Sequence, residues 1–137
     1  MTTDLLNPLL AIVSRSFPQY IQYAKPYIPP GRREVGEAIA AIITDQEGIA
    51  RRICQVLIDA DQVPHRGDFP MQFTDKHDLS MDYLLDIACD HQRQDIASID
   101  QLVGQLQRAP AAKALAEETL GMAKGHLQSL RELVEEA

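Results

Sequence analysis

The sequence predicts an all-α fold, a single domain (1–137) with four long helices packed as an up-down bundle and one long crossover between the second and third helices. Apolar residues recur at intervals of three and four along most of the chain. Stretches that alternate apolar and polar residues, which are typical of strands, are nearly absent. The length of 137 residues suits one ordinary domain and is too short for two.

The first helix is expected at about residues 3–25. Its apolar series is Leu6, Leu10, Val13, Phe17, Tyr20, Ala24 and Tyr27. Pro18 lies inside this series and lacks the N–H that would bond to the carbonyl of Ser14. We therefore expect a kink or a broken hydrogen-bond ladder near Ser14.

Three further apolar series predict helices at about 33–61, 80–107 and 110–135. Gln46 alone interrupts the stripe of the second helix, and Gln92 alone interrupts that of the third. Ser80 is suited to cap the third helix, and Pro110 stands where prolines begin helices.

Loop lengths predict the topology. Short connections make the first two helices one hairpin and the last two another. Residues 62–78 join the hairpins, and an extended chain of that size reaches about 55 Å, more than the roughly 40 Å of a bundle helix. The segment can therefore cross the whole bundle, which makes the second and third helices parallel. A disordered lid is the alternative for a loop of this size.

Composition excludes several classes. The net charge is −7, and the arginine pairs at 32–33 and 51–52 lie among acids, so we expect no nucleic-acid or membrane binding. No apolar run approaches the roughly 20 residues of a membrane span, and no basic leader opens the chain, so the expected location is cytoplasmic.

Several polar residues fall near the middle of the predicted helices, on or beside their apolar stripes. Buried polar groups cost free energy unless they are paired. The cluster is therefore either a layer that fixes helix register or a metal site between helices. Its members are Asp45, Gln46, His91, Gln92, Asp95 and His126.

The stretch 124–133, KGHLQSLREL, resembles the last helix of bacterioferritins and rubrerythrins, where a Glu-x-x-His motif precedes apolar residues at the same spacing. Residues 49–53, IARRI, together with Val63 and Pro64, resemble the second helix of that superfamily. The resemblance implies a ferritin-like bundle with the long crossover between the second and third helices.

The chain departs from the di-iron site that the resemblance implies. That site takes a Glu from the first and third helices and a Glu-x-x-His from the second and fourth. His126 matches, but Ala123 stands where its partner carboxylate belongs. The second helix has no histidine, and the Glu position of the third falls at or near His91.

The remaining candidate ligands are Asp45, His91, Asp95 and His126. Two acids and two imidazoles can hold one iron or zinc ion but cannot balance two irons. We therefore expect a non-catalytic ferritin-like structural or interaction module that has lost the di-iron site, with no cofactor and no catalytic residue. The alternative is a ferritin-like protein that binds a single metal ion, for metal handling or as an oxidoreductase.

Two features indicate a homodimer or another homo-oligomer. Gly121 and Gly125 lie one turn apart in the fourth helix, where close approach of another backbone would explain them. The alternative explanation is a locally weak helix. Leu5, Leu9 and Ile12 give the first helix a second apolar edge.

A phosphotransfer domain is the competing class among small acidic bundles. It requires a histidine followed closely by Lys and Gly, and neither His91 nor His126 has such a sequence after it.

Overall fold

The structure, a computed structural model, describes residues 5–71, 73 and 80–135. Within these ranges the regular elements are all helical, which confirms the all-α prediction. The last three predicted helices fall within two residues of their expected ends. The elements are α1 (Leu6–Ser14), α2 (Phe17–Ala24), a 3₁₀ turn η2 (Pro30–Arg32), α3 (Arg33–Asp59), α4 (Met81–Gln105) and α5 (Pro110–Glu135).

The prediction of one helix over 3–25 was wrong, because the chain forms two helices there; residues 3 and 4 lie outside the described ranges. α1 ends at Ser14, and Ser16 is extended (φ −67°, ψ 163°) with its hydroxyl accepting from the N–H of Gln19. Pro18 thus sits in the first turn of α2, where its missing N–H costs no helical bond. The expected break near Ser14 is confirmed, in the stronger form of a full interruption.

The other helix ends follow local rules. Lys25 takes a left-handed conformation (φ 51°) and ends α2 just before Pro26. The hydroxyl of Ser80 accepts from the N–H of Tyr83, which confirms it as the N-cap of α4. α5 begins at Pro110, as predicted.

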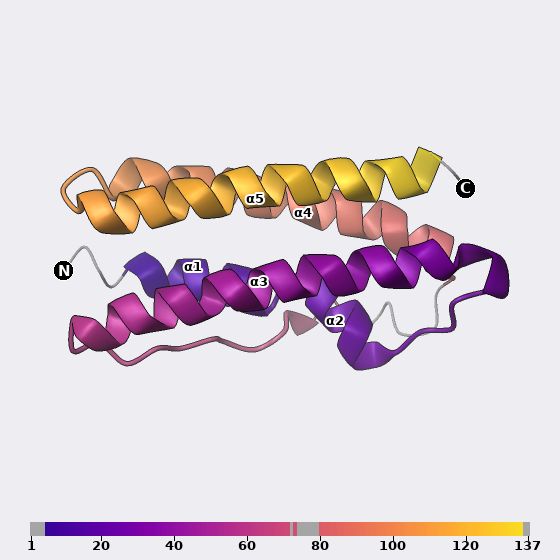
Figure 1. The fold of residues 1–137 in the computed structure, drawn as a ribbon, viewed down its shortest axis with the longest axis horizontal. Helices are drawn as coiled ribbons and strands as arrows, with labels where there is room; N and C mark the ends of the chain where they lie inside the picture. Colours follow the sequence, from indigo (N-terminus) through magenta and orange to yellow (C-terminus); the bar gives the residue numbers. More distant parts are fainter. Residues whose placement is uncertain (1–4, 72, 74–79, 136–137) are drawn as a thin grey trace.

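Figure 1 shows how the helices are arranged. α4 and α5 lie side by side as an antiparallel pair, and α3 runs antiparallel to α1 on the other side of the bundle. α3 also packs on α5, and α1 packs on α4. α3 and α4 begin at the same end of the bundle, at the right of the view. None of the helices in the described ranges is long and apolar enough to span a bilayer.

The connection after α3 runs back along the bundle beside α1. Residues 60–70 carry no helix (Figure 1), and the side chains of Asn7 and Arg15 bind their backbone. The amide of Asn7 donates to the carbonyl of Val63 (3.1 Å) and its oxygen accepts from the N–H of His65 (2.7 Å). Nε of Arg15 donates to the carbonyl of Gly67 (2.7 Å). These bonds hold the connection against α1. Residues 72 and 74–78 of the predicted crossover lie outside the described ranges.

The core consists of two apolar clusters, one toward each end of the bundle. The first joins α1 to the second halves of α3 and α4 and the first half of α5. The second joins α2 to the first halves of α3 and α4 and the second half of α5. Buried polar side chains lie near the boundary between them, and we call them the polar layer: Ser14, Ser16, Gln19, Gln46, Gln92 and His126.

The apolar edge expected to promote self-association is used within the chain. Leu9 is fully buried, and Leu5 and Ile12 pack against the first cluster. A Cβ added at Gly121 or Gly125 would meet no atom within 4 Å among the described residues. Close packing within the bundle therefore does not explain these glycines.

Replacing Ser16 with alanine should destabilise the fold by about 1–3 kcal/mol, because it removes the α2 cap and a buried bond to Gln46. Urea unfolding followed by circular dichroism measures this change. Ser98→Ala is the control, because Ser98 is exposed in the interior of α4 and alanine is a good helix former. Equal stability of the two variants would contradict the proposed importance of the helix break.

Candidate functional site

One of the four predicted site residues, His126, belongs to the polar layer, and it is bonded to a second, Asp45, at the edge of that layer. Nε2 of His126 on α5 lies 2.9 Å from Oδ2 of Asp45 on α3. The imidazole is buried (8% exposed side chain), whereas the carboxylate keeps 57% of its surface in solvent. Because a carboxylate accepts, the bond places a proton on Nε2 of His126. Asp45 thus joins α3 to α5 while remaining hydrated.

A second polar contact joins α4 to α5 at the same level. Nε2 of Gln92 donates to the carbonyl of Ala123 (2.9 Å). Oε1 of Gln92 and Nδ1 of His126 are buried, and neither has a hydrogen-bond partner within the described part of the chain. Unpaired buried polar atoms are uncommon, and these two mark where the hydrogen bonding of this layer is least complete.

The α2 side of the polar layer is a network around Gln46. Its side-chain oxygen accepts from the hydroxyl of Ser16 (2.9 Å) and from Nε2 of Gln19 (3.3 Å). Nε2 of Gln19 also lies 3.4 Å from a carboxylate oxygen of Glu47. Gln46, which interrupts the apolar stripe in the sequence, therefore ties α3 to the break between α1 and α2.

The other two predicted residues, His91 and Asp95, lie apart from the Asp45–His126 pair. The ring of His91 stacks on Phe17 (centroids 5.2 Å apart, planes at 20°) and meets Phe73 edge-on (4.8 Å). His91 and Asp95 both line a cavity of about 270 Å³ between α1, α4 and the connection after α3. Asp45 instead faces a groove between α3 and α5.

Burial dominates the electrostatics of Asp95. Desolvation raises the pKa of its carboxyl to about 7. The charged or polar residues that line the same cavity are Arg15, Asp68, His91 and Gln94. Arg15 donates to the carbonyl of Gly67 and lies over the ring of Phe69, 5.2 Å from its centroid.

The groove between α3 and α5 holds a surface ion pair. Nη1 and Nη2 of the Arg52 guanidinium donate to the two carboxylate oxygens of Glu118, at 2.5 and 2.8 Å. This contact lowers the pKa of Glu118. Both side chains are about half exposed, so the pair adds little stability.

The residues do not fit the iron centre that the resemblance implies. Across the described residues, no three His, Cys, Asp or Glu side chains come close enough to hold a metal ion together. The predicted set of four is thus divided between two places, with Asp45 and His126 bonded to each other. The described structure gives no arrangement through which a di-iron reaction could be derived.

The comparisons with known proteins give no match. A comparison with protein-family models finds no match, and neither a curated protein nor a solved structure matches it. The ferritin resemblance therefore depends on the short stretches of sequence alone.

Sequence reasoning missed two concave sites. The cavity beside Asp95 needs Arg15 at the end of α1 and Asp68 and Phe73 beyond α3, residues that only the fold brings together. An apolar groove of about 260 Å³ lies between α2 and α3, lined by four isoleucines and Lys25. The one sequence signal for this groove is the proline-rich segment after α2. This segment turns the chain so that Ile28 lies against α3. The isoleucines are Ile21, Ile28, Ile39 and Ile43.

Asp95 should make stability depend on pH. The pKa of Asp95 is raised from 3.8 to about 7 in the folded state, which favours the neutral acid. The contribution of Asp95 to the free energy of unfolding is therefore full below about pH 4 and is lost as the pH rises to about 7. Asp95→Asn should therefore stabilise the protein at pH 8 by about 1–3 kcal/mol and have little effect near pH 4. Thermal unfolding across this range measures the difference.

The matched control is Asp100→Asn, which changes an exposed acid on the same helix. A profile for Asp95→Asn that parallels that of the control would contradict the assigned burial.

Proposed function

We propose that this chain is a non-catalytic interaction module with a ferritin-like arrangement of helices, and that it acts as a homodimer. The observation that carries the proposal is the polar layer, in which side chains at the level of the family's metal site bind one another: Asp45 binds His126, and Gln46 binds Ser16 and Gln19. Groups used in this way stabilise helix register.

The arrangement of the helices supports the ferritin-like part of the proposal. α3 and α4 begin at the same end of the bundle, and the connection between them travels beside α1. A bundle of two hairpins joined by one long crossover is the pattern of ferritin-like folds. Up-down-up-down bundles with short loops would instead make α3 and α4 antiparallel.

The missing carboxylates support the loss of metal chemistry. Ala123 lies in the buried face of α5, three residues before His126, and offers no ligand. Ser14 and Ser16 occupy the corresponding level on the α1–α2 side, where Ser14 accepts from Arg66 (3.1 Å). A pair of ferric ions would lack negative ligands in this environment.

Metal analysis tests this part of the proposal. The chain incubated with Fe(II) or Zn(II) and desalted should retain less than one ion, and it should not accelerate the oxidation of Fe(II) by dioxygen. His126→Ala serves as the comparison, because it removes the residue best placed to bind metal. Retention of one ion that this variant loses would favour the single-metal alternative, and two ions per chain would overturn the proposal.

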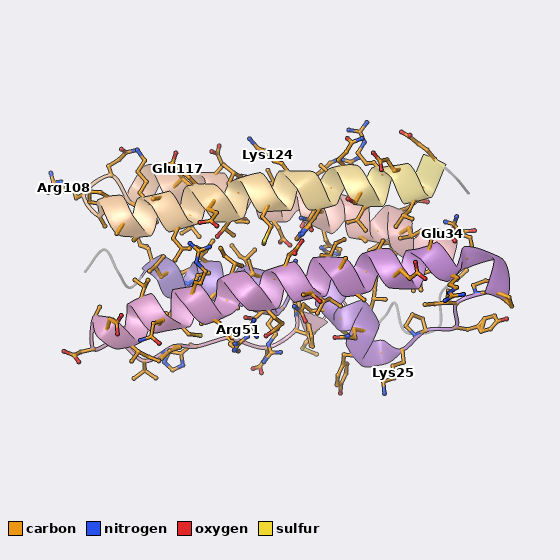
Figure 2. The ribbon with its side chains drawn as sticks, viewed as in Figure 1. Lys25, Glu34, Arg51, Arg108, Glu117 and Lys124 are labelled. Carbon is orange, nitrogen blue, oxygen red and sulfur yellow. The ribbon has the colours of Figure 1, made fainter. Side chains whose placement is uncertain are left out.

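The groove between α2 and α3 is the proposed dimer surface. The lining of this groove is largely apolar. Gly36 leaves room for Ile28, since a Cβ at position 36 would lie 3.1 Å from the Ile28 side chain. Tyr27, which is 73% exposed, stands between Pro26 and Ile28 of the lining. Lys25 projects into solvent from the end of α2 (Figure 2).

A hollow beside a projecting aromatic side chain favours a second copy as the occupant. A two-fold interface joins the same patch on both subunits, so the patch must offer both a projection and a recess. Tyr27 supplies a projection with large apolar area, and the isoleucine groove supplies the recess. The outer side of α5, where Glu117 and Lys124 project (Figure 2), is charged.

Light scattering tests the dimer. At micromolar concentration the mass should be twice the 15.3 kDa of the chain, and Tyr27→Asp should reduce it to that of one chain. Tyr83→Asp is the control, because Tyr83 is an exposed tyrosine on α4. A monomeric wild type, or a dimer that survives Tyr27→Asp, would contradict this assignment.

A further inference from the structure

We propose that the cavity between α1, α4 and the connection after α3 binds a small organic amine, with its ammonium group on Asp95. This site is separate from the polar layer and from the groove between α2 and α3. It is independent of the proposed function.

The cavity leads from solvent to an aromatic wall. Asp68 and Gln94 on its lining are exposed, Asp95 and His91 are partly buried, and Phe73 is buried. Its volume of about 270 Å³ is below the range of about 300–1,000 Å³ for drug-sized ligands, so the expected ligand is small.

Asp95 is the feature that indicates a cation. Its carboxyl is largely desolvated, and within the described part of the chain nothing donates to it or pairs with it. An ammonium ion placed there would supply the missing donors and the opposite charge. Asp68 adds a second carboxylate to the lining, and the net charge of −7 favours the approach of cations.

The remaining walls suit an amine better than an anion. The cation of the lining, Arg15, already donates to Gly67 and lies over the ring of Phe69. Phe73 and His91 form an aromatic wall through their edge-on contact (4.8 Å), and the face of a phenyl ring attracts an ammonium group. Ala11 and Ile12 offer apolar surface for a short carbon chain.

A bare metal ion fits the cavity less well than an amine. Metal sites need several ligands that converge, and no such group of His, Cys, Asp or Glu occurs in the described ranges. An alkylammonium ion needs one carboxylate and an apolar wall, and the cavity supplies both.

The experiment is a titration of the full chain with butylamine at pH 8, followed by two-dimensional NMR of the backbone amides. Saturable shifts should centre on residues 11–15, 68 and 91–95. The matched ligand control is 1-butanol, which has the same carbon chain without the charge. Asp95→Asn should weaken butylamine binding by about tenfold or more, the effect of losing a charge-assisted bond.

Asp100→Asn is the matched protein control and should bind like the wild type, and the unshifted remainder of each spectrum shows that the variant is folded. Three results would each overturn the proposal: no saturable shift at tens of millimolar butylamine, equal binding of 1-butanol, or unchanged affinity in Asp95→Asn. Zn(II) that shifts the same residues while butylamine does not would also overturn it, in favour of a metal site.

Discussion

The fold depends on the polar layer that separates its two apolar clusters. Apolar side chains alone tolerate sliding of one helix along another, since one leucine replaces the next with little change in contact area. Hydrogen bonds in the interior do not tolerate such sliding, because a shift leaves the donor and acceptor unpaired. The bonds of Gln46 to Ser16 and of Asp45 to His126 therefore fix α3 relative to α2 and α5.

The same layer explains why the first rod of the bundle is made of two helices. Because Ser16 is extended, its hydroxyl reaches the side-chain oxygen of Gln46. A continuous helix with the same sequence would direct this hydroxyl elsewhere. Pro18 lowers the free-energy cost of the interruption, because proline fits the first turn of a helix better than the interior. Local chemistry and a tertiary contact thus favour the same break.

Sequence periodicity was sufficient for α3, α4 and α5, because their apolar stripes, the cap at Ser80 and the proline at 110 are local signals. It placed Gln46, Gln92 and His126 in one layer, since each interrupts or adjoins a stripe near mid-helix. It grouped His91 and Asp95 with that layer, whereas in the structure both lie with Phe73 and residues of α1. Which side of α4 faces the crossover is a tertiary property that periodicity does not contain.

The connection after α3 is bonded at residues 63, 65 and 67 to Asn7 and Arg15, which precede it by more than fifty positions. The amide of His65 belongs to an exposed loop residue, yet it is bonded to Asn7 (2.7 Å). Hydrogen exchange at this amide consequently requires separation of the connection from α1. Such an opening is larger than an ordinary loop fluctuation. Separation of the two would open the cavity beside Asp95, because Ala11 and Ile12 of α1 and Asp68 and Pro70 of the connection line it together.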